Sequence, residues 1–333
     1  MASHHAAARS FLIATLEMKT MNTAQRVGLL LFGTLAACSM MASAATLEQA
    51  SPSVLWVKGD RPGAAISSVI VTTEGLVVVD ATCRSEGTAA WLKGELQRRF
   101  KQPVKYVVLS HDHEDHICDL DVFDDTATTI AQVKAREAVV REKRNTSVPD
   151  ITFEDKMSLW LGGREIQLVY FGPTHSDNLI QIYLPDEKVF IAPDFMQRGK
   201  GLIPDFRDMD VDNMLRVWNY VYRMYDIDVI VNGHGGTSPK EDILNNIRYV
   251  QTLRQAVLDA MVKGTSLDTM RSSMKLPEFA DWRGYPQWLE ADIVSMWDYL
   301  YRKREPNLGP AHDAWQSVVD KVVKGASATS PSK

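Results

Sequence analysis

Six consecutive residues, His111 to His116 (His-Asp-His-Glu-Asp-His), all carry side chains that can bind a metal ion, and this run constrains the chain more than any other feature. It follows an apolar stretch (104–109) that predicts a strand. At the end of a strand, side chains two apart point the same way, so His111, His113 and Asp115 are expected to converge while His116 turns to a neighbouring point. Three imidazoles and a carboxylate at this spacing suit zinc or a similar ion, and they can serve two adjacent ions.

Three more metal-capable side chains lie at the ends of predicted strands. His175 lies between two apolar runs, Asp194 closes the apolar run 189–193, and His234 follows the run 229–231. One such histidine alone would more often be a structural residue. Because the pattern repeats at four strand ends, we expect these side chains to meet in one cleft at the edge of a sheet.

Together with Val77-Val-Val-Asp80, the motifs Gly172-Pro-Thr-His175 and Asn232-Gly-His234 give residues 53–264 a clear pattern. This pattern resembles the metallo-β-lactamase superfamily. The resemblance implies an α/β fold, the αβ/βα four-layer sandwich, with two sheets back to back, helices outside and the site along one edge. A helical extension is expected after it.

The resemblance also implies a role for each motif residue. It implies that one zinc ion is held by His111, His113 and His175. A second is held by Asp115, His116 and His234. Asp194 reaches both ions, whereas Asp80 orients the ligand loop and binds no metal. Asp115 and His116 are predicted to be catalytic as well as metal-binding.

Two zinc ions predict a hydrolase, because they bring the pKa of a shared water toward neutrality and polarise the bond under attack. A bridging hydroxide would attack an ester, lactone, thioester or amide carbonyl of a small molecule, in preference to a phosphoryl or sulfuryl centre. An iron-dependent redox protein on the same scaffold is the alternative class. Its members tend to have a carboxylate where His113 stands, so zinc is favoured over iron or manganese.

Candidate substrate contacts are fewer. Arg198 and Lys200 follow Asp194 closely and are interpreted either as a site for an anionic substrate group or as a solvated basic turn. Asn178 is a third candidate. One subclass of zinc β-lactamases has a Cys where Asp194 stands, but residues 172–185 resemble the lactamase branch. β-Lactam hydrolysis therefore remains the leading specific alternative.

The N-terminal segment (1–44) is interpreted as a leader and signal peptide of an exported bacterial protein. The apolar stretch 27–37 suits a secretory signal, and Ala42-Ser-Ala44 suits cleavage after Ala44. An alternative is an envelope lipoprotein anchored through Cys38. Met18 and Met21 are both plausible starts. The expected location is the periplasm or the outside of the cell, with no transmembrane span in the mature chain.

Two cysteines, Cys83 and Cys118, remain after such cleavage, in a compartment that permits disulfides. Both follow predicted site residues closely along the chain. A disulfide between them and two separate thiols both stay open.

Composition predicts one hydrolase domain (45–264) and a C-terminal helical extension with a disordered tail (265–333). The chain is 45% hydrophobic, which suffices for a full core, and its net charge of −5 gives no reason to expect a nucleic acid. Aromatic residues after 264 predict packing against the sandwich, or else a cleft wall or dimer contact; the oligomeric state is open. Strands are expected at 53–58, 66–72, 75–80, 104–109, 128–132, 151–154, 157–161, 164–171, 179–184, 188–193 and 228–231. Helices are expected at 85–99, from 133 to 143, at 211–225 and at 239–263.

Overall fold

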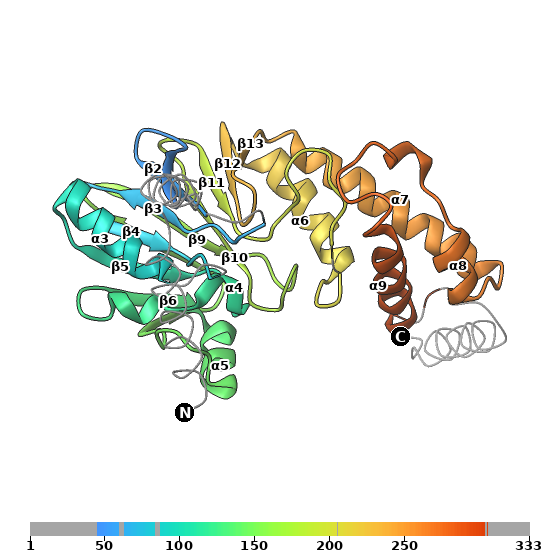
Figure 1. Ribbon diagram of the computed structural model, residues 1–333, viewed down its shortest axis with the longest axis horizontal. Coiled ribbons are helices and arrows are strands. Elements are labelled where there is room, and N and C mark those ends of the chain that lie inside the picture. Colours follow the sequence, from blue (N-terminus) through green and yellow to red (C-terminus); the bar gives the residue numbers. More distant parts are fainter. Residues whose placement is uncertain (1–44, 60–62, 84–86, 205, 304, 306–333) are drawn as a thin grey trace, which may run out of the picture. The chain divides into compact units, whose positions relative to one another are not determined.

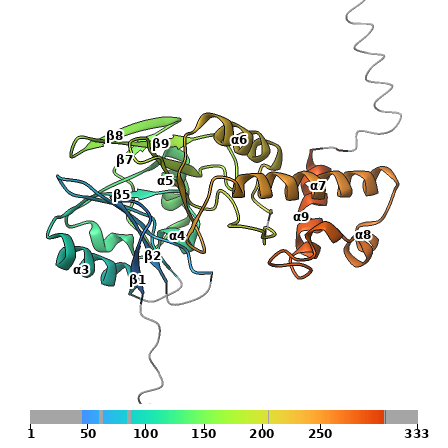
Figure 2. The same ribbon diagram turned by 90° about the horizontal axis from the view of Figure 1, so that it is seen from above.

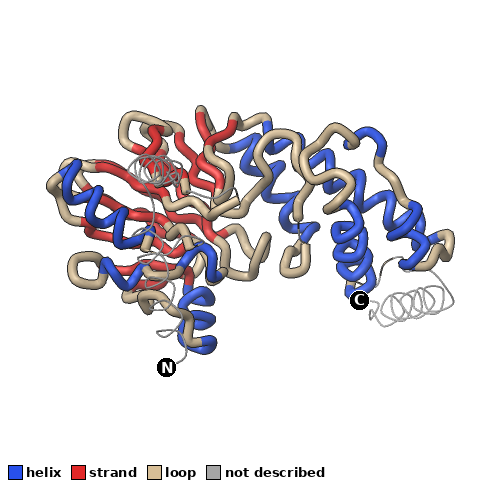
Figure 3. The backbone as a smooth tube through the Cα atoms, in the orientation of Figure 1, coloured by secondary structure: helices blue, strands red, loops and turns tan. Residues whose placement is uncertain are grey.

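Two β-sheets form the centre of the protein (Figure 1, Figure 3). The structure is a computed structural model that describes residues 45–303 and 305, apart from 60–62, 84–86 and 205. Within these residues the first sheet contains, in spatial order, β1 (Thr46–Gln49), β2 (Val54–Lys58), β3 (Ser68–Val71), β4 (Leu76–Val79), β5 (Val104–Leu109), β6 (Thr128–Gln132) and β7 (Ile151–Phe153). The second contains β13 (Thr237–Ser238), β12 (Val229–Asn232), β11 (Val189–Ala192), β10 (Ile180–Leu184), β9 (Arg164–Tyr170) and β8 (Lys156–Leu161).

Helices cover the outer faces of both sheets (Figure 2). The first sheet carries α3 (Thr88–Phe100), α4 (Glu114–Ile117), the 3₁₀ helix η1 (Leu120–Phe123) and α5 (Val133–Glu142). The chain after β11 adds α6 (Val211–Met224), α7 (Asp242–Val262), α8 (Leu267–Ser273), the 3₁₀ helix η2 (Pro277–Phe279) and α9 (Leu289–Arg302). None of these helices is both long enough and apolar enough to cross a membrane.

The core has three layers because successive side chains of a strand point to opposite faces. In β4, Val77 and Val79 face the second sheet, whereas Leu76 and Val78 pack under the helices of the first. In β11, Ile191 faces between the sheets and its neighbours on either side face α6 and α7. This alternation gives the αβ/βα four-layer sandwich expected from the sequence.

Both sheets contribute to one edge. The parallel strands β4, β5 and β6 end there, and so do the parallel strands β11 and β12 of the second sheet. Two backbone hydrogen bonds join the sheets at this edge, from Ile180 N to Ser110 O (2.9 Å) and from Ile66 N to Gly233 O (2.7 Å). Loops from both sheets therefore meet at one place.

Most predicted elements are present within one to three residues of their expected bounds, and β5 and β6 match them fully. Up to residue 264, four short elements of the described chain were not predicted: β1, α4, η1 and β13. The strand β1 has mostly exposed side chains and is held by pairing with β2, so it has no apolar pattern to detect. The others have four residues or fewer, which is too short for a periodic signal.

The chain after residue 264 packs into the same core as the second sheet. Trp282 and Tyr299 are buried in the cluster that contains Trp218 of α6, so packing is the correct interpretation for both. Tyr301 is 63% exposed and takes no part in that cluster. The predicted leader, Cys38, the tail and Trp315 lie outside the described residues, and the boundaries at 44 and 264 stay predictions.

A partly buried carboxylate joins the two sheets away from the site. Glu187, in the turn between β10 and β11, accepts hydrogen bonds from Ser51 Oγ (2.5 Å), Ser53 N (3.1 Å) and Arg164 Nη1 (2.6 Å). Burial alone raises the pKa of Glu187, but these hydrogen bonds outweigh burial and lower the pKa from 4.5 to about 2. The carboxylate therefore stabilises the fold at neutral pH.

Replacing Glu187 with Gln is expected to lower the free energy of unfolding by about 2 kcal/mol at pH 7, allowing for partial exposure. Because the folded pKa is the lower one, this contribution is complete above pH 4.5 and is lost as the pH falls toward about 2. Urea unfolding of both proteins at pH 7 and pH 3 checks this. If the two proteins differ in free energy of unfolding by the same amount at both pH values, the prediction is contradicted.

Candidate metal centre

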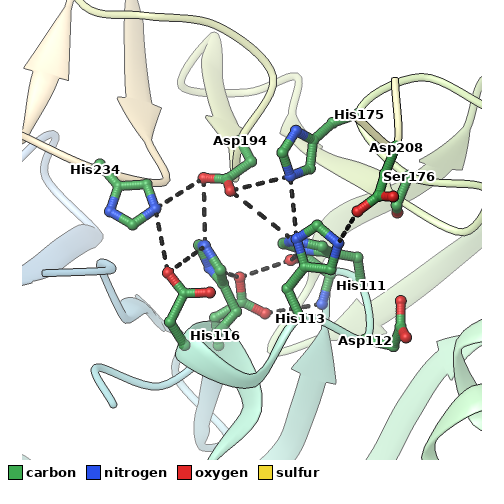
Figure 4. Close-up of polar contacts among 12 residues, drawn as sticks. His111, Asp112, His113, His116, His175, Ser176, Asp194, Asp208 and His234 are labelled. Carbon is green, nitrogen blue, oxygen red and sulfur yellow. Dashed lines mark hydrogen bonds and ion pairs between the residues drawn. The ribbon is translucent and has the colours of Figure 1, made fainter. Parts of the chain in front are cut away.

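Five histidines and two aspartates come together at the shared edge of the two sheets (Figure 4). They form two adjoining groups, and within each group the ligand atoms lie within 4.8 Å of one another. The first group is His111, His113, His175 and Asp194. The second is Asp115, His116 and His234. All seven predicted ligands are therefore brought together, in the grouping that the family resemblance implied.

Asp194 lies between the two groups (Figure 4). Its Oδ2 is 3.3 Å from His175 Nε2 and 3.9 Å from His111 Nε2, both in the first group. Its Oδ1 is 3.3 Å from His116 Nε2 and 3.1 Å from His234 Nε2, both in the second. One carboxylate thus has an oxygen for each group, which is the arrangement that a ligand shared by two cations requires.

Buried ligand atoms at this centre lack hydrogen-bond partners among the described residues. His111 Nε2, His116 Nε2 and Asp194 Oδ1 are such atoms, although each points toward the others. A buried polar atom without a partner costs about 1 to 3 kcal/mol. Divalent cations between the two groups would satisfy all three atoms, so the donor set fits metal ions.

Asp80 supports one histidine from each group. It is fully buried, and its Oδ2 lies 3.1 Å from His116 Nδ1. The same oxygen accepts the hydroxyl of Ser110 (2.6 Å), and that hydroxyl lies 2.8 Å from His111 Nδ1. Asp80 Oδ1 also accepts the backbone N–H of Ser110. Both imidazoles are thereby oriented with Nε2 toward the centre, as expected of Asp80 from the sequence.

Two further contacts hold ligand histidines and were not predicted. His234 Nδ1 lies 3.1 Å from the carbonyl oxygen of Gly63, and His113 Nε2 lies 3.7 Å from Asp208 Oδ2. His113 therefore offers Nδ1 to the centre, 3.1 Å from His175 Nε2. Gly63 and Asp208 are far from these histidines along the chain, so no local pattern indicates them. Ser110 directly precedes the His-rich run and could have been noticed.

The backbone after residue 113 differs from the expected strand-end loop. His113 is extended, but the next four residues form the helical turn α4. Asp115 therefore does not point the same way as His111 and His113, and that part of the prediction is wrong. The helical turn places Asp115 Oδ2 3.6 Å from His234 Nε2 and 3.9 Å from His116 Nε2.

Unusual backbone conformations occur at Asp80, which supports the ligand histidines, and at Asp194, the predicted shared ligand. Asp80 has φ 60° and Asp194 has φ 43°, in the left-handed region that residues other than glycine rarely adopt. Close packing accompanies them: a Cβ at Gly233 would lie 2.4 Å from Asp194 Oδ1 and from Asp194 N. The glycine of Asn232-Gly-His234 thus lets the His234 loop lie directly against Asp194.

The electrostatics of the protein atoms favour positive charge at the centre. Burial raises the pKa of Asp194, but His116 and His234 outweigh burial and hold the pKa well below its ordinary value. Burial lowers the pKa of His116, yet Asp194 and Asp80 raise that pKa well above its ordinary value. Burial dominates at His111, whose pKa is well below its ordinary value. Asp194 is therefore held in its carboxylate form, in which it can bind a cation.

The three predicted substrate contacts have partners elsewhere. Asn178 is buried, and its amide binds the backbone N–H and the carboxylate of Asp112, so it supports the ligand loop and does not face a substrate. Arg198 donates to the carbonyl oxygens of Thr237 (2.9 Å) and Gly235 (3.2 Å). Lys200 pairs with Asp281 at the surface. For Arg198 and Lys200, the structure favours the interpretation as a basic turn.

Cys83 and Cys118 form a disulfide, so the second of the two open alternatives, separate thiols, does not hold in the structure. The bond joins the segment after β4 to the end of α4. Two backbone hydrogen bonds accompany it, from Ala81 N to His116 O and from Cys83 N to Asp115 O. The disulfide therefore fastens the helical turn that carries Asp115 and His116.

Comparison with known proteins identifies the class. The family described as the metallo-beta-lactamase superfamily matches residues 60–234, more than half of the chain. The protein belongs to this superfamily. Its fold and its cluster of histidine and aspartate side chains able to bind metal ions are those expected of a member.

The particular relatives are distant. The 2,4-dinitroanisole O-demethylase subunit alpha of Nocardioides sp. (strain JS1661) is 26% identical over 60% of this chain, which spans only 62% of that subunit. The metallo-beta-lactamase type 2 of Elizabethkingia meningoseptica is 22% identical over 58% of this chain and 77% of its own.

Solved structures share the fold. The sec-alkylsulfatase Pisa1 from Pseudomonas sp. has a TM-score of 0.62 and 19% identity, over 76% of this chain and 50% of its own. A metallo-beta-lactamase from Pontibacter korlensis has a TM-score of 0.56 and 19% identity, over 62% of this chain and 99% of its own.

Proposed function

We propose that this protein is a dinuclear zinc hydrolase that cleaves an ester, lactone, thioester or amide bond in a small molecule. The position of Asp194 carries the proposal, because its two oxygens face two separate groups of ligand atoms. Imidazole and carboxylate ligands suit zinc. When bound, two zinc ions activate water as a nucleophile near neutral pH and stabilise the negative charge that develops on the substrate.

Some of the ligand side chains form the buried inner side of the site, and others lie at the solvent side, where a substrate can enter. His111 and His116 are fully buried and are fixed through Asp80 and Ser110, so they provide the rigid inner side of the site. The side chains of His113, His175, Asp115 and His234 are between 20% and 31% exposed. A substrate therefore approaches from their side.

No serine or cysteine nucleophile is needed in this proposal. The two cysteines near the centre are joined in a disulfide, and Ser110 is buried behind His111 with its hydroxyl bonded to Asp80. Asp115 is oriented toward His116 and His234. It would hold the second cation, and its carboxylate would be the proton acceptor beside the attacking water.

The experiment is a substrate screen of the zinc-loaded protein, before and after removal of metal with a chelator. The substrates are a p-nitrophenyl ester, an acyl lactone, a thioester, a β-lactam, a phosphodiester and an alkyl sulfate. The last is included because a structural relative is named as an alkylsulfatase. We expect hydrolysis of a carboxylic ester, lactone or thioester that disappears on chelation and returns with zinc. Undiminished turnover without metal would overturn the proposal.

β-Lactam hydrolysis is the second candidate, favoured by the named relatives of Elizabethkingia meningoseptica and Bacillus cereus. The same screen separates it from the first. A metal analysis and visible spectrum of the purified protein distinguish zinc from iron or manganese.

We also propose export to the periplasm. Mass spectrometry of the mature N-terminus tests this proposal: a start at Ala45 indicates cleavage after Ala44, and a lipidated Cys38 indicates an envelope lipoprotein.

A further inference from the structure

An apolar pocket of about 120 Å³ opens beside the candidate metal centre. It borders three of the predicted ligands, His175, Asp194 and His234, on one side. The rest of its described lining is Gln197 and six apolar residues: Phe195, Met196, Ile203, Pro204, Met209 and Trp218. A substrate held with its reacting bond at the centre would place an adjoining group here.

The segment from Phe195 to Ile203 forms one wall of this pocket. Side chains of α7, which do not line the pocket, hold the backbone of this wall by hydrogen bonds. The backbone N–H and carbonyl of Gln197 both bind the side chain of Asn246 in α7, at 2.8 Å each. Gly199 N donates to Asp242 Oδ2, also in α7 (2.6 Å). These bonds fix the backbone of the wall.

Arg283, from the chain after residue 264, holds the same wall by its backbone and its side chain. Two backbone hydrogen bonds join it to the wall: Leu202 N donates to Arg283 O, and Arg283 N donates to Lys200 O, each at 3.0 Å. Its Nη2 donates to Gln197 Oε1 (3.0 Å), the one uncharged polar side chain in the pocket lining. A Cβ at Gly201 would lie 2.6 Å from Nη2, so the glycine makes room for the guanidinium.

Three cations near the pocket are directed to partners outside its lining or at its rim. Arg198 donates to backbone carbonyls of the His234 loop, and Lys200 pairs with Asp281. Arg283 donates to Gln197 and to the carbonyl of Arg198. None of the three lines the pocket. A carboxylate entering its apolar part would lose its hydration and find no lysine or arginine among the described lining residues to replace that hydration.

We propose that this pocket receives an uncharged, apolar group of the substrate, and that Arg283 is a positioning residue that sets the wall of the pocket through Gln197. The proposal rests on the proposed hydrolase function and narrows its substrate class. It makes the C-terminal helical part of the chain a contributor to substrate selection.

The first test compares p-nitrophenyl butyrate with p-nitrophenyl succinate, which have the same leaving group and acyl length but differ by a terminal carboxylate. We expect metal-dependent kcat/KM to be at least about tenfold higher for butyrate, because the carboxylate must be desolvated. Equal or faster hydrolysis of the succinate would overturn the proposal.

Binding of 1-hexanol to the zinc-loaded protein, measured by calorimetry, tests the pocket without turnover. We expect saturable binding that Met196→Asp weakens by about tenfold or more. If hydrolysis fails but 1-hexanol binds in this way, the proposed function is wrong and the pocket stands. If 1-hexanol does not bind, or binds both proteins equally, the pocket proposal is wrong.

Arg283→Ala tests the positioning role. We expect KM for the butyrate to rise about fivefold to tenfold with kcat changed less than about twofold, a clearly larger loss than for p-nitrophenyl acetate, whose acyl group is shorter, and zinc content to be unchanged. Gln197→Ala should likewise raise KM for the butyrate with little change in kcat. The double variant should raise KM little further than either single variant. Arg271→Ala is the matched control, because Arg271 pairs with Glu290 at the surface of the same part of the chain.

Equal losses on acetate and butyrate, or no loss in either Arg283→Ala or Gln197→Ala, would contradict the role of Arg283. If Arg283→Ala does not fold, Gln197→Ala alone decides, since it removes the contact with the pocket and leaves the backbone pairing of Arg283 in place.

Discussion

Replacing Asp194 with Ala is expected to abolish metal-dependent hydrolysis, with kcat/KM reduced by roughly a thousandfold or more. The carboxylate faces both groups of ligands, within 3.3 Å of His116, His175 and His234. Its loss removes a ligand from both predicted ions and leaves Asp115, in the second group, as the remaining carboxylate among the predicted ligands. Bound zinc should therefore fall at both positions.

Steady-state kinetics and elemental analysis after equilibrium dialysis against zinc measure these effects. Asp194→Asn keeps the shape of the side chain, so it separates the loss of charge from the loss of volume. Asp226→Ala is a suitable control, because Asp226 is an exposed aspartate that pairs with Lys188 in the same sheet region. Full zinc content with normal turnover in Asp194→Ala would refute the shared-ligand role.

Asp80→Asn is expected to lower zinc affinity by about 10-fold to 100-fold while leaving the fold largely intact. The asparagine oxygen can still accept the Ser110 N–H, and asparagine tolerates the φ of 60° found here. Its amide N–H₂, however, faces His116 Nδ1 where Asp80 Oδ2 accepts. Two donors cannot pair, so His116 is driven to the tautomer that carries its proton on Nε2 and offers no lone pair to a metal ion.

A zinc competition assay against a chromophoric chelator measures the affinity, and urea unfolding measures the stability. Asp80→Ala should lower both, with a stability loss of about 3 kcal/mol, because buried donors at Ser110 and His116 lose their acceptor. Ser110→Ala is the companion variant, since it disconnects His111 and leaves the contact between Asp80 and His116. Unchanged zinc affinity in Asp80→Asn would show that the contact does not set the tautomer.

One sequence pattern predicts both the strands and the metal ligands: a buried apolar run followed by a polar side chain. Apolar runs such as 104–109 and 189–192 are mostly buried, and a polar functional side chain follows within two residues of their ends. That combination predicts functional side chains at His111, Asp194 and His234, each at the end of a strand. It also placed the histidines of both sheets on one edge.

Contacts between distant segments could not be predicted in this way. The partners of the ligand histidines, Gly63 and Asp208, lie in loops without a pattern of their own, and Arg283 reaches the pocket from beyond the sandwich. The pairing of Cys83 with Cys118 was open because it depends on how the helical turn α4 lies beside the end of β4. The three predicted substrate contacts bind other parts of the protein, because residue type alone does not indicate where a side chain points.

A crystal structure of the protein grown with zinc, with anomalous data collected at the zinc edge, tests the central claim most directly. The account predicts two peaks about 3.5 to 4 Å apart, with His111, His113 and His175 around one and Asp115, His116 and His234 around the other. One oxygen of Asp194 should lie against each peak. A single peak, no peak, or a second peak that Asp194 does not touch would contradict the account.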